Sequence, residues 1–187
     1  MIKCFLDMDG VLVNFVGGLF KLHRVPNLYE DPSNLGNWHC DEMITKYKNI
    51  SKNQVFDPLE EDFWANLEPM HDFNPLLKII EDHFGRENIC LMTSPTMNKG
   101  CPAGKLRWIE KHMPWYYKNR HWNIGSLKHF SAHKNSILLD DSAENIKKFH
   151  YEGGDTILIP RPWNHAHIYA NDVVDHLSNV FKVVRSN

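Results

Sequence analysis

The sequence predicts an α/β fold: a Rossmann-like, doubly wound parallel sheet with a small helical cap inserted after its first strand. Two observations support this prediction. Apolar segments of strand length alternate with amphipathic segments of helix length from residue 71 onwards. An earlier apolar segment, residues 2–6, is separated from them by a stretch with too few apolar residues in register for a sheet layer. We therefore expect a core of residues 1–14 and 71–187 and a cap of residues 15–70.

The individual elements follow from local patterns. Short apolar segments bounded by turn residues or acids predict strands at 2–6, 88–93, 136–139 and 156–159. Helical spacing of apolar residues predicts helices at 14–24, 41–50, 72–84, 99–112, 145–150 and 173–184, with Asp72 as the cap of the third. Residues 115–122 are aromatic and basic, and the patterns leave them unplaced.

Composition narrows the class of protein. The chain has 187 residues, of which 42% are hydrophobic and 24% charged, as in an ordinary globular protein. A net charge of -2 argues against extended nucleic acid or an anionic membrane as a partner. The four scattered cysteines indicate reduced thiols, and the first strand begins too early for a signal peptide. We expect a cytoplasmic protein, and a homodimer is left open.

Polar side chains follow three of the predicted strands. They are Asp7 and Asp9 after the first, Thr93 and Ser94 after the second, and Asp140 and Asp141 after the third. Ligands bind beyond the carboxyl ends of the strands in open α/β sheets, so these groups should line one crevice. Carboxylates gathered there repel one another unless a cation lies between them, and oxygen ligands alone suit Mg²⁺.

This inventory suits phosphoryl transfer. Asp7 would attack phosphorus as a covalent nucleophile, and Asp9 would act as general acid and then general base. The hydroxyls of Thr93 and Ser94 could contact the phosphate, and Lys105 on the next predicted helix could supply positive charge. The simpler interpretation of the first motif alone is a solvated Asp-x-Asp-Gly turn.

The set resembles the haloacid dehalogenase superfamily, which has D-x-D-G-[VT] at the first strand, Thr or Ser at the second, a helical Lys and paired acids. Within it, the chain is similar to the 5'(3')-deoxyribonucleotidases. That similarity rests on DMDGVLVNF at 7–15, NLEP at 66–69, MTSP at 92–95, CPAGK at 101–105, WIEK at 108–111, ILLDD at 137–141 and IPRPWN at 159–164.

The resemblance implies a specific site. Asp7 would be the nucleophile and Asp9 the acid/base, and Mg²⁺ would be held by Asp7, the Asp9 carbonyl and Asp141. The sequence alone leaves open which of the two neighbouring acids, Asp140 or Asp141, contacts the metal directly. The expected substrates are deoxynucleoside monophosphates, hydrolysed through an aspartyl phosphate. The alternatives are another small phosphomonoester such as a sugar phosphate, polynucleotide 3'-phosphate ends, or a silent nucleotide-binding module on the same fold.

Aromatic residues would provide a surface for the base. By resemblance Phe15 and Trp38 occupy positions that line the base pocket of the family, and Trp64 is a weaker candidate. Stacking on an aromatic ring contributes about 1–3 kcal/mol per base. The alternative for each is a place in the apolar core of the cap.

Some basic residues cannot be assigned to one role. Lys128 precedes the paired acids and could bind substrate, with Lys134 as the alternative, but Phe130 stands where a polar contact is expected. Arg161 could brace the end of the sheet or reach the substrate. His165 and His167 are interpreted as exposed loop residues, because a third metal ligand is not apparent.

Overall fold

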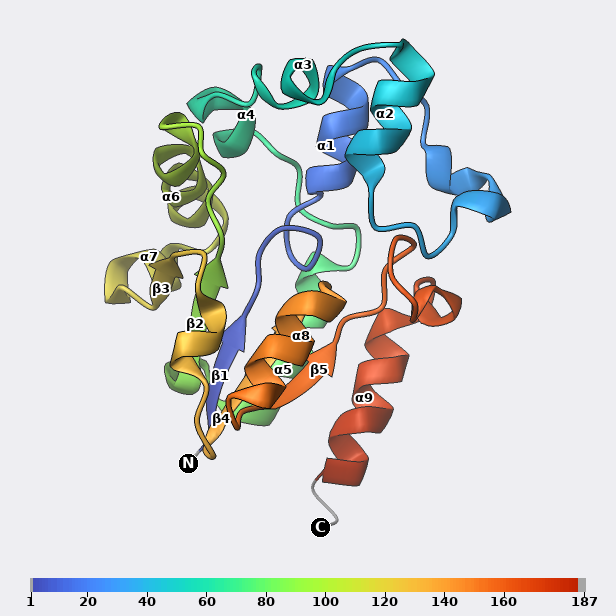
Figure 1. Cartoon of the computed structure of the whole chain (residues 1–187). Coiled ribbons are helices and arrows are strands. Elements are labelled where there is room, and N and C mark those ends of the chain that lie inside the picture. Colours follow the sequence, from blue (N-terminus) through green and yellow to red (C-terminus); the bar gives the residue numbers. More distant parts are fainter. Residues whose placement is uncertain (1, 185–187) are drawn as a thin grey trace.

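The computed structural model describes residues 2–184, and side chains over 2–182. Five parallel strands form one sheet in the order β3-β2-β1-β4-β5 (Figure 1). The strands are β1 (Lys3–Leu6), β2 (Ile89–Thr93), β3 (Trp122–Ile124), β4 (Ser136–Asp140) and β5 (Asp155–Leu158). The predicted doubly wound parallel α/β fold is confirmed. Residues 1 and 185–187 of the predicted core lie outside the described residues.

The centre of the sheet is almost wholly apolar. β1 pairs with β2 on one side and β4 on the other, with Leu6 opposite both Leu91 and Leu139. Every residue of β4 is buried, and Leu6, Leu91 and Leu139 are fully inaccessible. Strands covered on both faces are expected to be continuously apolar, which is why these short segments could be located from the sequence.

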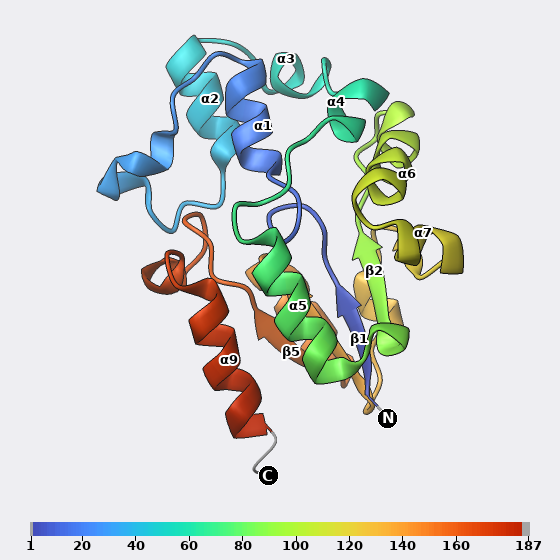
Figure 2. The same cartoon turned by 180° about the vertical axis from the view of Figure 1, so that it is seen from behind.

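Helices cover both faces of the sheet. They are α5 (Phe73–Phe84), α6 (Gly100–His112), α7 (Pro114–Asn119), α8 (Ala143–Tyr151) and α9 (Val173–Val184). α8 lies on the face toward the viewer in Figure 1, whereas α5 and α9 lie together on the opposite face, toward the viewer in Figure 2. In α5, Phe73, Leu76 and Ile80 follow helical spacing and are buried.

The segment between β1 and α5 forms a separate layer beyond the carboxyl ends of the strands (Figure 1). It contains α1 (Phe15–Leu22), α2 (Cys40–Lys48), α3 (Lys52–Phe56), α4 (Glu61–Ala65) and 3-10 turns at Leu28–Glu30 and Pro32–Asn34. α3 and α4 were not predicted from the sequence. The α3 helix begins with a capping box between Ser51 and Gln54, which stabilises a helix too short to show apolar periodicity.

The layer is tied to the core through α4 and α6. A Cβ atom on Gly104 would lie 2.3 Å from the Glu61 carbonyl oxygen, and one on Gly100 would lie 2.6 Å from the Glu61 nitrogen. Glycine at both positions therefore allows the two helix backbones to approach closely. Arg107 adds exposed ion pairs to Glu61 and Asp62.

Two features of the core were not apparent from the sequence. The unplaced residues 115–122 form α7 and lead into the edge strand β3, whose pairing with β2 could not be recognised in three residues. Asp72 precedes α5 but its side chain makes no capping hydrogen bond. Asp72 is the N-cap residue of α5, as predicted, but its carboxylate pairs with Arg161 and does not bond to the helix backbone.

Over the described part of the chain, every helix is too short or too polar to cross a bilayer.

Candidate active site

The site begins where β1 ends. Asp7 is the first residue beyond the strand, and its backbone nitrogen still donates to Leu139 of the neighbouring strand. The chain then turns at Gly10. The φ at this position is 78°, in the left-handed region that favours glycine. A Cβ at Gly10 would also lie 2.0 Å from Asp141 Oδ2. This turn brings the first motif against the acids at the end of β4.

Asp7, Asp140 and Asp141 form a compact cluster of buried carboxylates. One oxygen from each lies within 4.8 Å of the others, and the three residues are at most 5% exposed. Burial, followed by the charge of Asp140, raises the pKa of Asp7 to about 7. Burial and the charges of Asp140 and Asp7 also hold the pKa of Asp141 well above its usual range. The cluster thus disfavours its own full ionisation.

Lys128 partly compensates this charge. Its Nζ donates to Asp7 Oδ1 at 2.5 Å and to Asp140 Oδ2 at 2.7 Å. Burial opposes the charged form of Lys128, but the two carboxylates raise its pKa overall. Three carboxylates against one ammonium still leave two negative charges when all are ionised.

The residues present fit a divalent cation. Both oxygens of Asp140 are engaged, because Oδ1 accepts from the Ser142 nitrogen and Oδ2 from Lys128 and Asn145. By contrast, hydrogen-bond donors among the described residues reach only one oxygen of Asp7, from Lys128, and one of Asp141, from Trp163. Asp7 and Asp141 therefore keep carboxylate oxygens for a hard cation such as Mg²⁺, and the excess negative charge favours one.

Asp9 belongs to a second group, separate from the carboxylate cluster. Lys105 Nζ donates to Asp9 Oδ2 and, at 2.7 Å, to Thr93 Oγ1. The Thr93 hydroxyl lies 3.4 Å from the same Asp9 oxygen. The other oxygen, Asp9 Oδ1, is buried and has no hydrogen-bond partner within the described part of the chain. Such an unpaired acceptor is costly and usually marks a place for a ligand or a catalytic role.

The two candidate lysines lie against different carboxylates of the site. Lys105 is 2% exposed and contacts Asp9 and Thr93, while Lys128 is 4% exposed and contacts Asp7. Lys128, which was expected to bind substrate, thus lies beside the expected nucleophile. The alternative, Lys134, is exposed, and Phe130 is 76% exposed.

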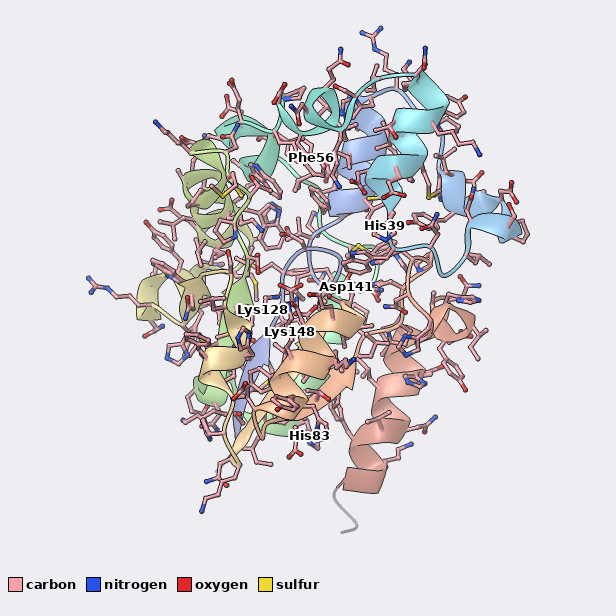
Figure 3. All side chains as sticks on the ribbon, viewed as in Figure 1. His39, Phe56, His83, Lys128, Asp141 and Lys148 are labelled. Carbon is pink, nitrogen blue, oxygen red and sulfur yellow. The ribbon has the colours of Figure 1, made fainter. Side chains whose placement is uncertain are left out.

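A cavity of about 470 Å³ opens beyond these carboxylates. Figure 3 shows Asp141 and Lys128 on its sheet side and His39 and Phe56 on its cap side. Its volume is in the range of pockets that bind small molecules. The lining residues from the cap layer are Phe15, Val16, Trp38, His39, Cys40, Asp41, Lys52, Phe56 and Trp64.

The predicted aromatic residues all reach this cavity, in different ways. Phe15 is half-buried and stacks on Trp64, with ring centroids 5.2 Å apart and planes inclined by 3°. Trp64 is 2% exposed and donates its indole N–H to the Leu59 carbonyl, so it also belongs to the cap core. Trp38 is 45% exposed. Ser94 lines the cavity, while Thr93 is fully buried behind it.

Several residues at the site were not identified from the sequence. Trp163 donates to Asp141 Oδ2 at 2.6 Å, and Asn145 donates to Asp140 Oδ2 at 3.0 Å. Trp163 stands in the quoted IPRPWN motif, so that motif could have suggested it. Asp41 and Lys52 lie 11 residues apart with no local pattern that links them. Only the packing of α2 on α3 shows that they meet.

The loop after β5 stabilises the site from outside. Arg161 is fully buried and contacts Asp72 and the carbonyls of Gly10 and Val11, so it braces the sheet end. His165 is exposed and His167 is half-buried, and neither belongs to a metal-ligand group within the described residues.

The fold is that of haloacid dehalogenase-like hydrolases. Three solved structures align with TM-scores of 0.53–0.57 at 13% identity. A predicted phosphatase from Clostridium acetobutylicum covers 100% of both chains with a TM-score of 0.57. The alignment with a haloacid dehalogenase family hydrolase from Deinococcus radiodurans, solved with bound phosphate and sodium, covers 91% of this chain and 87% of that chain, with a TM-score of 0.55. A haloacid dehalogenase-like protein from Streptococcus pneumoniae covers 96% and 98% (0.53).

Sequence comparison defines the family. Residues 1–186 match the model of the 5' nucleotidase, deoxy (pyrimidine), cytosolic type C protein family, and the chain belongs to that family. A curated relative, the mitochondrial 5'(3')-deoxyribonucleotidase of Mus musculus, is 30% identical over 118 residues. The match covers 59% of this chain and about half (52%) of the length of the mouse protein. The resemblance stated from the motifs is confirmed.

Proposed function

We propose that the protein is a Mg²⁺-dependent 5'(3')-deoxyribonucleotidase that hydrolyses deoxynucleoside monophosphates through an aspartyl phosphate. The observation that carries the proposal is the division of the first motif between two environments. Asp7 lies in the acidic cluster, while Asp9, two residues on, is held by Lys105 and has one buried, unpaired oxygen. Two nearby carboxylates in different surroundings suit two different chemical roles.

Asp7 would be the nucleophile. Lys128 holds Oδ1 and so orients the Asp7 carboxylate, one oxygen of which would attack phosphorus. The bond from phosphorus to the ester oxygen breaks as the aspartyl phosphate forms. Ser94, which lines the same cavity as Asp7, is a candidate donor to the phosphate oxygens.

Asp9 would act as the acid and base. In the first step its unpaired Oδ1 would carry the proton that the departing alcohol receives. In the second step the ionised Asp9 would take a proton from the water that hydrolyses the aspartyl phosphate. Lys105 and Thr93 hold Oδ2, so Oδ1 stays directed to the reacting atoms in both steps.

Asp7, Asp141 and the Asp9 carbonyl are the groups proposed to hold Mg²⁺. When bound, the ion supplies positive charge that offsets the repulsion between the carboxylates and a phosphate dianion. Asp140 instead anchors Lys128 and Asn145.

The aromatic cap wall supports a nucleotide as the substrate. Phe15 and Trp38 offer flat surfaces beyond the phosphate end of the cavity. The family name refers to deoxynucleotides, and the mouse relative is named a deoxyribonucleotidase. We further propose that residues 15–70 act as a cap that excludes water, and that the location is cytoplasmic, as the family name states.

A substrate panel tests the proposal. The purified protein, assayed with Mg²⁺, should release phosphate from deoxynucleoside 5'- and 3'-monophosphates faster than from 2-deoxyribose 5-phosphate. Asp7→Asn should abolish release while the circular dichroism spectrum is unchanged. Equal rates with and without the base would favour a sugar phosphatase, and release by Asp7→Asn would contradict the role of Asp7.

A further inference from the structure

The cap wall of the cavity carries an ion pair. Asp41, in the first turn of α2, and Lys52, the first residue of α3, both line the cavity that also contains Asp7 and Asp141. Asp41 Oδ2 and Lys52 Nζ are 2.7 Å apart. The Asp41 side chain is 12% exposed and that of Lys52 is 64% exposed.

The pair retains hydrogen-bonding capacity that the protein does not use. The hydrogen bonds of the described residues leave Asp41 Oδ1 without a donor. Lys52 has three ammonium protons, and the ion pair needs one of them. A pair that served only to join α2 to α3 would not need to face the cavity.

Aromatic rings line the cavity together with this pair. Lys52 Nζ lies 6.0 Å from the centroid of the Phe56 ring, and Phe56 and Trp38 line the same cavity. The cap wall therefore combines flat apolar surfaces with one group that can only accept hydrogen bonds and one that can only donate them. A nucleobase has the matching chemistry: two flat faces, and an edge that presents a donor next to an acceptor.

We infer that Asp41 and Lys52 together bind the hydrogen-bonding edge of the substrate base and determine base specificity. Asp41 accepts from the N–H of that edge, and Lys52 donates to the neighbouring oxygen or ring nitrogen. This inference rests on the proposed nucleotidase function. It adds that the cap distinguishes bases through an ion pair, in addition to stacking.

The test couples a change in the substrate to a change in the protein. The nucleotide hydrolysed fastest among dTMP, dGMP, dAMP and dCMP is compared with its analogue in which the edge donor is methylated, for example N3-methyl-dTMP. A hydrogen bond to a charged group predicts that methylation lowers kcat/KM of the wild type on the order of 10- to 100-fold. In Asp41→Ala, the same methylation should change kcat/KM less than about twofold.

A second variant covers the case in which Asp41→Ala does not fold. Lys52→Met should raise KM for the unmethylated nucleotide on the order of tenfold with a smaller effect on kcat, and Lys52→Arg should recover most of the loss. The matched controls are Asp57→Asn and Lys48→Met, which alter exposed charges of the cap outside the cavity lining. Both variants should keep the wild-type ratio of kcat/KM for the nucleotide to kcat/KM for its methylated analogue.

The outcomes separate the two proposals. If the wild type hydrolyses nucleotides no faster than 2-deoxyribose 5-phosphate, the nucleotidase function fails, and this inference fails with it. If the wild type prefers nucleotides but Asp41→Ala keeps the full methylation effect, the inference is overturned alone. It is also overturned if Lys52→Met and Lys48→Met have the same KM.

Discussion

The Arg161 guanidinium forms a two-armed ion pair with Asp72, at 2.7 and 3.1 Å, in a fully buried position. The same guanidinium donates to the carbonyls of Gly10 and Val11, at 2.6 and 2.8 Å. Asp72 stands where the chain re-enters the core from the cap, and Gly10 stands where it leaves. Arg161 therefore fixes both crossings between core and cap at the end of the motif that carries Asp7 and Asp9.

Arg161→Met should destabilise the protein strongly. The change leaves Asp72 buried without its counter-ion and two carbonyls without donors, which predicts a loss of about 3–5 kcal/mol of unfolding free energy. Urea denaturation measures it. Arg107→Met, which removes the exposed ion pairs to Glu61 and Asp62, is the control and should change little. Comparable midpoints for the two variants would contradict the importance of the buried pair.

Removal of the Asp9 carboxylate should affect substrates according to their leaving group. Asp9→Asn is expected to lower kcat for a deoxynucleoside monophosphate by about 10²–10⁴, because the sugar alkoxide needs a proton to depart. An aryl phosphate, whose leaving group is stable without that proton, should lose less in the aspartyl-phosphate-forming step. Single-turnover phosphate transfer measures that step. Equal losses for both substrates would exclude Asp9 as the acid.

Mg²⁺ should stabilise the folded protein measurably, since it relieves repulsion among buried carboxylates. At a hundred times its Kd, the gain is about 2.7 kcal/mol, visible as a higher Tm, and EDTA should reverse it together with activity. Asp141→Asn should lose most of this Mg²⁺-dependent rise in Tm. Asp57→Asn, in the cap, should retain it. A rise of the same size in Asp141→Asn would remove that residue from the metal site.

The exposed ring of Trp38 should contribute to base binding. Loss of one stacking contact of about 1–3 kcal/mol predicts that Trp38→Ala raises KM for nucleotides roughly 5- to 150-fold. The effect on 2-deoxyribose 5-phosphate should be smaller, since that substrate has no base. The control is Tyr47→Ala, which removes an exposed aromatic ring on α2 that lies outside the lining of this cavity. If Trp38→Ala affects both substrates alike, Trp38 does not contact the base.

The sequence predicted the central strands, the parallel sheet and the family. Buried parallel strands are continuously apolar, so β1, β2 and β4 stood out, and their carboxyl ends could be expected to meet. The edge strand β3 and the short helices α3 and α4 did not stand out. Three to five residues are too few to show periodicity, and the pairing or capping that defines them depends on other segments.

The tertiary structure decided which charged side chains contact one another. Lys105 and Lys128 are both plausible phosphate ligands when each is viewed along the chain. In the fold, Lys105 contacts Asp9 while Lys128 contacts Asp7 and Asp140. Likewise, Asp72 preceded a helix as a capping residue would, but Arg161, 89 residues later, binds its carboxylate.

By itself, the sequence determined that carboxylates, a hydroxyl and a lysine gather at one edge of a parallel sheet, because strand direction places successive carboxyl ends together. Only the tertiary structure decided which carboxylate oxygen pairs with which lysine or arginine. It also decided that Asp9 Oδ1 is left unpaired and that Asp41 meets Lys52 in the cap wall. Those contacts join residues far apart in the chain. Their strength depends on distance and burial, which residue order does not specify.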